Sequence, residues 1–115
     1  MAKKSYNTIR MTKNGKVSFK LNRTGFEELN IVVDRMMDIK KLRPKKIDAK
    51  IQASLIVELK MNLLRRSWII KDEYNFSLTV PQALALFLWS NPEEDLMDLC
   101  LNIRELNQSI HQQLI

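Results

Sequence analysis

The sequence predicts an α+β domain in which helices dominate and a small antiparallel sheet packs on three to four of them. Three observations indicate this class. Asn14-Gly15 lies between two segments of alternating apolar residues, which is typical of a β-hairpin. Later segments carry apolar residues at helical spacing. Finally, 115 residues include only two Gly and three Pro, so most of the chain is expected in regular structure.

The N-terminal hairpin has two possible loop lengths. A two-residue loop would place Met11 and Val17 on opposite faces of the hairpin. A three-residue loop with Gly15 in the left-handed conformation pairs Met11 with Val17 instead, and it pairs Ile9 with Phe19. The longer loop keeps these apolar side chains on one face, so we predict a three-residue loop with a bulge at Gly15. The reverse face is then basic and rich in hydroxyl groups.

The first helix is expected over about residues 25–41. Thr24 and Glu27 match a capping box, in which the two side chains satisfy free backbone N–H groups at a helix start. A proline disfavours helical backbone in the residue before it, so Pro44 predicts that the helix stops near Leu42. Apolar residues at helical spacing give this segment one face that is directed to the core.

A second helix is predicted from about Pro44 or Asp48 to Ser67. It is apolar over more than half of its circumference, which predicts the central and most buried helix of the domain. Trp68, which follows it, is expected in the core beside two isoleucines. The alternative for Trp68 is a stacking group beside Arg65 and its neighbouring arginine.

The last third of the chain predicts a strand and two helices. Phe76, Leu78 and Val80 alternate with Ser77 and Thr79, which favours a third strand near residues 74–80 that joins the hairpin. Thr79 and Gln82 match a second capping box, so a short helix should follow to about Trp89. Pro92, followed by acidic residues, is typical of the start of a terminal helix.

The terminal helix carries apolar residues that alternate spacings of three and four, as in a short heptad seam. Two interpretations stand: packing against the protein's own helices, and an interface with a second copy or a partner helix. The candidate interface residues are Leu96, Leu99, Ile103, Leu106 and Ile110.

Length and charge define the organisation of the chain. One domain is expected, with a basic arm and hairpin (1–24), two helices (25–71) and an acidic C-terminal part (72–115). Arg104 is the only Lys or Arg in that last part, which holds seven of the 13 acidic residues. The first 24 residues contain seven Lys or Arg and no acidic residue, so an anion is the expected partner of that end.

Catalytic and metal sites are not expected. Cys100 is the only cysteine and His111 the only histidine, and on one continuous helix they would lie about 16 Å apart along the axis. They cannot form a nucleophile and base pair within one molecule, and Cys100 is expected to be a small buried side chain. No spacing typical of zinc ligands or of a phosphate-binding loop is present. We therefore predict a protein that is not an enzyme and needs no cofactor.

The lone cysteine and the lack of a secretory signal predict a cytoplasmic, reducing environment. The longest apolar stretches are interrupted by charged residues or Pro81, and they fall short of the ~20 residues that cross a bilayer. No membrane-spanning segment is expected.

The basic residues favour contact with nucleic acid. Clustered Lys and Arg neutralise phosphates without reading the base sequence. The alternative is an assembly or structural subunit, for example of a phage or mobile element, whose basic end meets acidic proteins or the acidic half of another copy, so a homo-oligomer is possible. The candidate nucleic-acid-binding residues are Lys3, Lys4, Arg10, Lys13, Lys16 and Lys20 in the arm and hairpin, and Lys41, Arg43, Lys45 and Lys46 in the connector.

Overall fold

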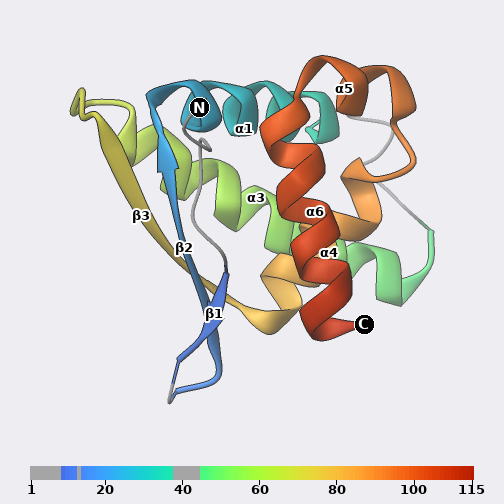
Figure 1. Ribbon diagram of the computed structural model, residues 1–115. Coiled ribbons are helices and arrows are strands. Elements are labelled where there is room, and N and C mark those ends of the chain that lie inside the picture. The colour runs from blue at the N-terminus through green and yellow to red at the C-terminus, as the bar shows by residue number, and fades with distance from the viewer. Residues whose placement is uncertain (1–8, 13, 38–44) are drawn as a thin grey trace.

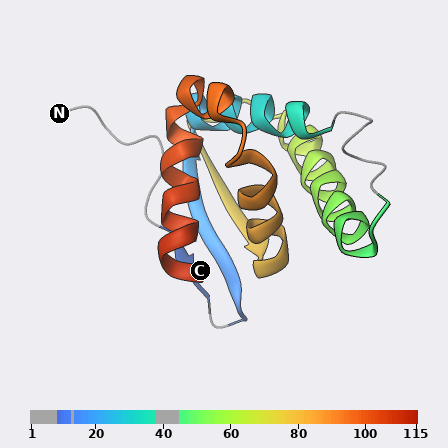
Figure 2. The same cartoon turned by 90° about the vertical axis from the view of Figure 1, so that its right-hand side faces the viewer.

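The computed structural model describes residues 9–12, 14–37 and 45–115, and it has a three-stranded antiparallel sheet with helices on one of its faces (Figures 1 and 2). The strand order is β1-β2-β3. The predicted α+β class, dominated by helices, is therefore confirmed. The elements are β1 (Arg10–Met11), β2 (Lys16–Asn22), α1 (Arg23–Met36), α3 (Ile47–Arg66), β3 (Glu73–Thr79), α4 (Val80–Ser90), α5 (Glu94–Leu99) and α6 (Leu101–Leu114).

The hairpin has the predicted three-residue loop. Thr12 N–H donates to the Lys16 carbonyl at 2.8 Å, and Gly15 N–H donates to the Thr12 carbonyl at 3.0 Å. Gly15 has a φ of 73°, a conformation that glycine adopts without a steric penalty. Met11 faces Val17, as predicted, and the register keeps the apolar side chains on one face.

The third strand pairs with β2 along its whole length, which confirms the strand expected near residues 74–80. Phe76 faces Phe19 and Tyr74 faces Leu21 across the antiparallel pair. The Phe19 and Phe76 rings stack with their centroids 5.3 Å apart. These residues form the inner face of the sheet, on which α1 and α4 pack.

The first helix begins earlier than predicted. Asn22 and not Thr24 is its N-cap, because the Asn22 Oδ1 accepts a hydrogen bond from Gly25 N–H at 2.9 Å. Strand β2 runs directly into α1, so its last residue is already extended and positioned to cap. The helix ends at Met36, and the predicted continuation to residue 41 falls on 38–44, outside the described residues.

The prediction that the second helix is central and most buried was wrong. Helix α3 packs on the outer sides of α1 and α4, because these two helices already occupy the inner face of the sheet. Only one face of α3 is buried, around Ile56 and Leu59. Trp68, expected in the core, is 88% exposed. The other large apolar side chains exposed on α3 or just after it are Ile47, Ile51, Val57, Met61, Leu64, Ile69 and Ile70.

The predicted terminal helix is two helices, α5 and α6, that meet at Cys100, whose φ of −108° and ψ of 68° are not helical. Glu28 of α1 reaches this break: its carboxylate accepts hydrogen bonds from Asn102 N–H, at 3.0 Å, and from the Asn102 side-chain amide. A carboxylate at a helix start satisfies a free N–H group and interacts favourably with the helix dipole. A contact between two residues that are 74 positions apart in the sequence therefore fixes where α6 begins.

Replacing Glu28 with Ala should lower the free energy of unfolding by about 2 kcal/mol, because a charge-assisted hydrogen bond at the α6 start is lost. Urea unfolding followed by circular dichroism measures the change. Glu27→Ala is the matched control, since Glu27 is exposed and its ion pair with Arg23 lies on the surface. The control should change the free energy by less than about 0.5 kcal/mol. Equal effects would contradict the role of Glu28.

Candidate nucleic-acid interface

The outward face of the sheet is entirely polar. Along β2 and β3 every second side chain is buried, so those between them point away from the helices. Among the described elements, none lies over this face (Figure 1). We call it the outer sheet face, and its residues are Arg10, Lys16, Ser18, Lys20, Asn22, Glu73, Asn75, Ser77 and Thr79.

Strand register arranges the cations of this face around a row of hydroxyl groups. Arg10 faces Ser18 on β2, and Ser18 faces Ser77 on β3. Lys16 and Lys20 lie two residues to either side of Ser18, so they are about 13 Å apart along the strand. That span is close to the rise of four base pairs of duplex DNA. The three cations can therefore meet one stretch of a phosphate backbone.

Glu73 is the one acidic residue among the described residues that define the outer sheet face. Glu73 faces Asn22 at one end, and its Oε2 is 4.0 Å from the Lys20 Nζ. Both side chains are more than half exposed, and an exposed pair at this distance contributes little energy. The face therefore keeps a net positive charge.

The third strand supplies polar groups that the list of candidate residues lacked. Asn75, Ser77 and Thr79 continue the outer sheet face beyond the hairpin. Their alternation with Phe76 and Leu78 is the signal in the sequence that could have identified them. Hydroxyl and amide side chains also bind phosphate oxygens, so β3 widens the surface that could meet a nucleic-acid backbone.

Arg66, at the end of α3, is used within the fold. Its guanidinium lies over the Phe76 ring, 4.6 Å from the centroid, and donates a hydrogen bond to the Asn75 carbonyl at 2.5 Å. These contacts attach the end of α3 to β3. Arg66 is thus a structural residue that also adds positive charge at the β3 edge.

The described residues of the two basic clusters expected from the sequence do not share a face. Lys45 and Lys46 immediately precede α3, and the start of α3 lies on the opposite side of the molecule from the sheet (Figure 1). Lys3, Lys4, Lys13, Lys41 and Arg43 lie outside the described residues. The described candidates on the outer sheet face are therefore Arg10, Lys16 and Lys20.

The candidate interface residues of the last two helices contribute mainly to the core. Leu96, Ile103, Leu106 and Ile110 are buried within this chain. Leu99 is 80% exposed, because the break at Cys100 turns α5 away from the direction of α6. A partner could reach only Leu99 among these five residues.

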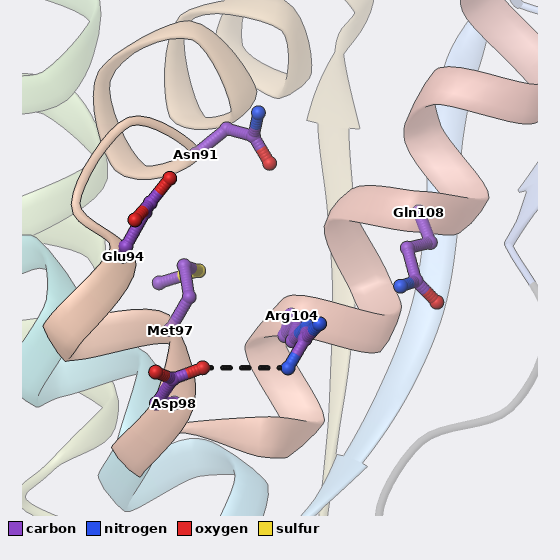
Figure 3. Close-up of a pocket in the computed structure, with 6 residues that line it drawn as sticks. All are labelled: Asn91, Glu94, Met97, Asp98, Arg104 and Gln108. Atoms are coloured by element: carbon purple, nitrogen blue, oxygen red, sulfur yellow. Dashed lines mark hydrogen bonds and ion pairs between the residues drawn. The ribbon is translucent and has the colours of Figure 1, made fainter.

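A polar hollow of about 460 Å³ lies between α5 and α6 (Figure 3). Its single cation, Arg104, points to Asp98 and lies 3.4 Å from the Asp98 Oδ1. A smaller hollow beside it includes His111, whose ring is 5.8 Å from the Phe87 ring. Among the described residues that line the two hollows there is no Ser, Thr or Cys. These linings therefore offer no nucleophile for His111.

The cysteine is a buried side chain, as predicted. Cys100 is 2% exposed, and burial raises the pKa of its thiol, with a further increase from the Glu28 carboxylate. A raised pKa disfavours the reactive thiolate. Within the described residues, no group of three or more His, Cys, Asp or Glu side chains is placed to hold a metal ion.

No described helix combines the length and the apolar character needed to cross a membrane. The chain matches no protein-family model, no curated protein and no solved structure. The outer sheet face and its chemistry are therefore the basis on which a function can be inferred.

Proposed function

We propose that this protein is a small, non-enzymatic nucleic-acid-binding protein that contacts phosphates through its outer sheet face. The observation that carries the proposal is an exposed sheet face with three cations, surrounding hydroxyl and amide groups, and no apolar side chain. Lys and Arg on a presented surface release counterions from a phosphate backbone, and this gain does not depend on the base sequence.

The composition of the face favours duplex backbone over splayed single strands. Binding of single strands commonly uses aromatic side chains on which bases stack. On this sheet Phe19, Tyr74 and Phe76 all point into the core, and Trp68 lies beyond the end of α3, outside the sheet. The outer sheet face therefore offers phosphate contacts without a stacking platform, and little discrimination between base sequences is expected.

An assembly role is the alternative, and the exposed acidic side of α5 favours it. Glu94, Asp95 and Asp98 are exposed on this helix, and they could meet the outer sheet face of another copy. Contact between unlike surfaces would produce head-to-tail chains. This alternative predicts oligomers without nucleic acid that dissociate as the salt concentration rises.

Fluorescence anisotropy with labelled DNA tests the proposal. Two 20-base-pair duplexes of unrelated sequence should bind with dissociation constants in the low micromolar range at about 50 mM salt, and within roughly threefold of each other. The corresponding single strands should bind more weakly, because the face lacks aromatic groups. No binding to either duplex at low salt would overturn the proposal, and light scattering on the same samples would then test the assembly alternative.

A further inference from the structure

Helix α3 presents an apolar surface to solvent. Met61 is 55% exposed, Leu64 is 44% exposed, and Trp68, just after the helix, is 88% exposed. Exposed apolar patches of this kind in soluble proteins commonly mark interaction sites. We call the set the α3 apolar surface, and its residues are Ile47, Ile51, Val57, Met61, Leu64, Trp68, Ile69 and Ile70.

The centre of this surface has the spacing of a helix–helix seam. Val57, Met61, Leu64 and Trp68 are separated by four, three and four residues, and Ser54 precedes them at a spacing of three. Residues spaced this way line one side of a helix and pack between the side chains of a second helix. Another side of α3 is buried against α1 and α4, whereas the seam side chains are exposed within the described part of the chain and can meet another molecule.

We propose that the α3 apolar surface is a dimer interface in which α3 packs antiparallel on α3 of a second copy. The two-fold axis would pass between Met61 and Leu64, so Met61 of one copy faces Leu64 of the other, and Val57 faces Trp68. Such an interface is self-complementary, since one surface serves both partners. The proposal goes beyond nucleic-acid binding and does not depend on it.

Charges beside the seam support a second copy as the occupant. Glu58 and Arg65 flank the same side of the seam, seven residues apart, and both are exposed. Glu58 also accepts a hydrogen bond at its Oε2 from the Gln82 Nε2 of its own chain, at 3.3 Å, and its other carboxylate oxygen can meet a partner. Antiparallel packing about the proposed axis brings Glu58 of one copy beside Arg65 of the other, twice per dimer. Lys60, on the other flank, already pairs with Asp34 of its own chain. A membrane surface with acidic headgroups would not favour the Glu58 carboxylate at the seam.

The fold also reduces the cost of association. A seam of about two heptads is too short to hold free peptides together as helices, because helix formation itself is costly. Here α3 is already held as a 20-residue helix by its buried face. Binding energy from the apolar surface is therefore available for dimerisation.

Sedimentation velocity and light scattering test the dimer. The wild-type protein should dimerise at roughly 10 to 100 μM, and the dimer should persist at about 0.5 M salt because its centre is apolar. Leu64→Glu should weaken dimerisation by at least about 30-fold, since it places two carboxylates at the centre of the interface. Leu101→Glu is the matched control, because Leu101 is an exposed leucine of α6, and it should leave the dimer intact.

A charge exchange tests the orientation of the helices. Arg65→Glu should weaken the dimer, because it brings a second carboxylate beside Glu58 of the other copy. Adding Glu58→Arg to this variant should restore dimerisation. Restoration requires these positions to be paired and cannot result from misfolding. Circular dichroism would verify that each variant is folded.

Three outcomes would overturn the proposal. One is a monomeric wild-type protein at about 100 μM. Another is a dimer that Leu64→Glu leaves unchanged. The third is a monomer that binds vesicles of phosphatidylcholine and phosphatidylserine and loses this binding on Leu64→Glu, which would assign the surface to a membrane. None of these results bears on DNA binding by the outer sheet face, so the two proposals fail independently.

Discussion

Replacing Phe76 with Ala should lower the free energy of unfolding by about 4 kcal/mol. Phe76 is 1% exposed, and its ring stacks on Phe19 and lies 6.2 Å from the Phe26 ring. Truncation to Ala removes this burial and leaves a cavity that a β-sheet cannot easily close. Arg66 would also lose the ring over which its guanidinium lies, and its hydrogen bond to the Asn75 carbonyl would be left as its contact with β3.

A loss of this size approaches the total stability of a small domain, which is about 5 to 15 kcal/mol, so a milder variant is needed. Phe76→Leu should cost about 1 to 2 kcal/mol and leave a protein with a measurable urea transition. Leu101→Ala, at an exposed position of α6, should change the free energy by less than about 0.5 kcal/mol. Similar losses for Phe76→Leu and Leu101→Ala would contradict the central place of Phe76 in the core.

Reversing two charges of the outer sheet face should abolish most DNA binding. In the variant with Lys16→Glu and Lys20→Glu, two phosphate contacts are lost and two repulsive charges are introduced. If each contact neutralises one phosphate, the affinity at about 50 mM salt should fall by at least about 100-fold. Both lysines are exposed, so the fold should remain intact. Anisotropy with a duplex measures the change.

The matched control carries the same charge change on the other side of the molecule. Lys45→Glu with Lys46→Glu alters the net charge equally, but these residues lie at the start of α3, away from the sheet. Binding to the outer sheet face predicts a loss of less than about fivefold, from long-range repulsion alone. Equal losses for the two variants would mean that net charge, and not this face, determines binding.

The hairpin could be predicted from the sequence because local rules determine it. Gly15 fixes the loop, and the alternation of Val17 and Phe19 with polar residues fixes the register. The capping box of Thr79 and Gln82 is also local, and both of its hydrogen bonds are present. The capping box predicted at Thr24 and Glu27 is equally local and was wrong, because Asn22 at the end of β2 caps the helix instead.

The position of α3 could not be predicted in the same way. Periodicity shows that a helix is apolar over much of its circumference, but it does not show which part meets the core. Which side of α3 is buried depends on α1 and α4. These two helices cover the inner face of the sheet, and α3 packs against them. The side chains of Met61 and Trp68 are consequently exposed, although the sequence indicated a buried helix.

The break at Cys100 has a distant cause as well. The heptad spacing of Leu96, Leu99 and Ile103 is continuous in sequence, and it predicted one helix. Glu28 instead caps a new helix at Asn102 from 74 residues away.

For the outer sheet face, the hairpin cations were predictable, whereas the contribution of Ser77 and its neighbours required the pairing of β2 with β3.

The measurement that tests the outer sheet face most directly is the salt dependence of duplex binding by the wild-type protein and by a variant with Arg10→Ala, Lys16→Ala and Lys20→Ala. Each phosphate contact adds about 0.9 to the slope of log K against log salt. If these three side chains contact phosphates, the slope of the variant should be shallower by about 2.7, whatever the rest of the chain contributes. Equal slopes for the two proteins would contradict the account, because any nucleic-acid binding would then use another surface.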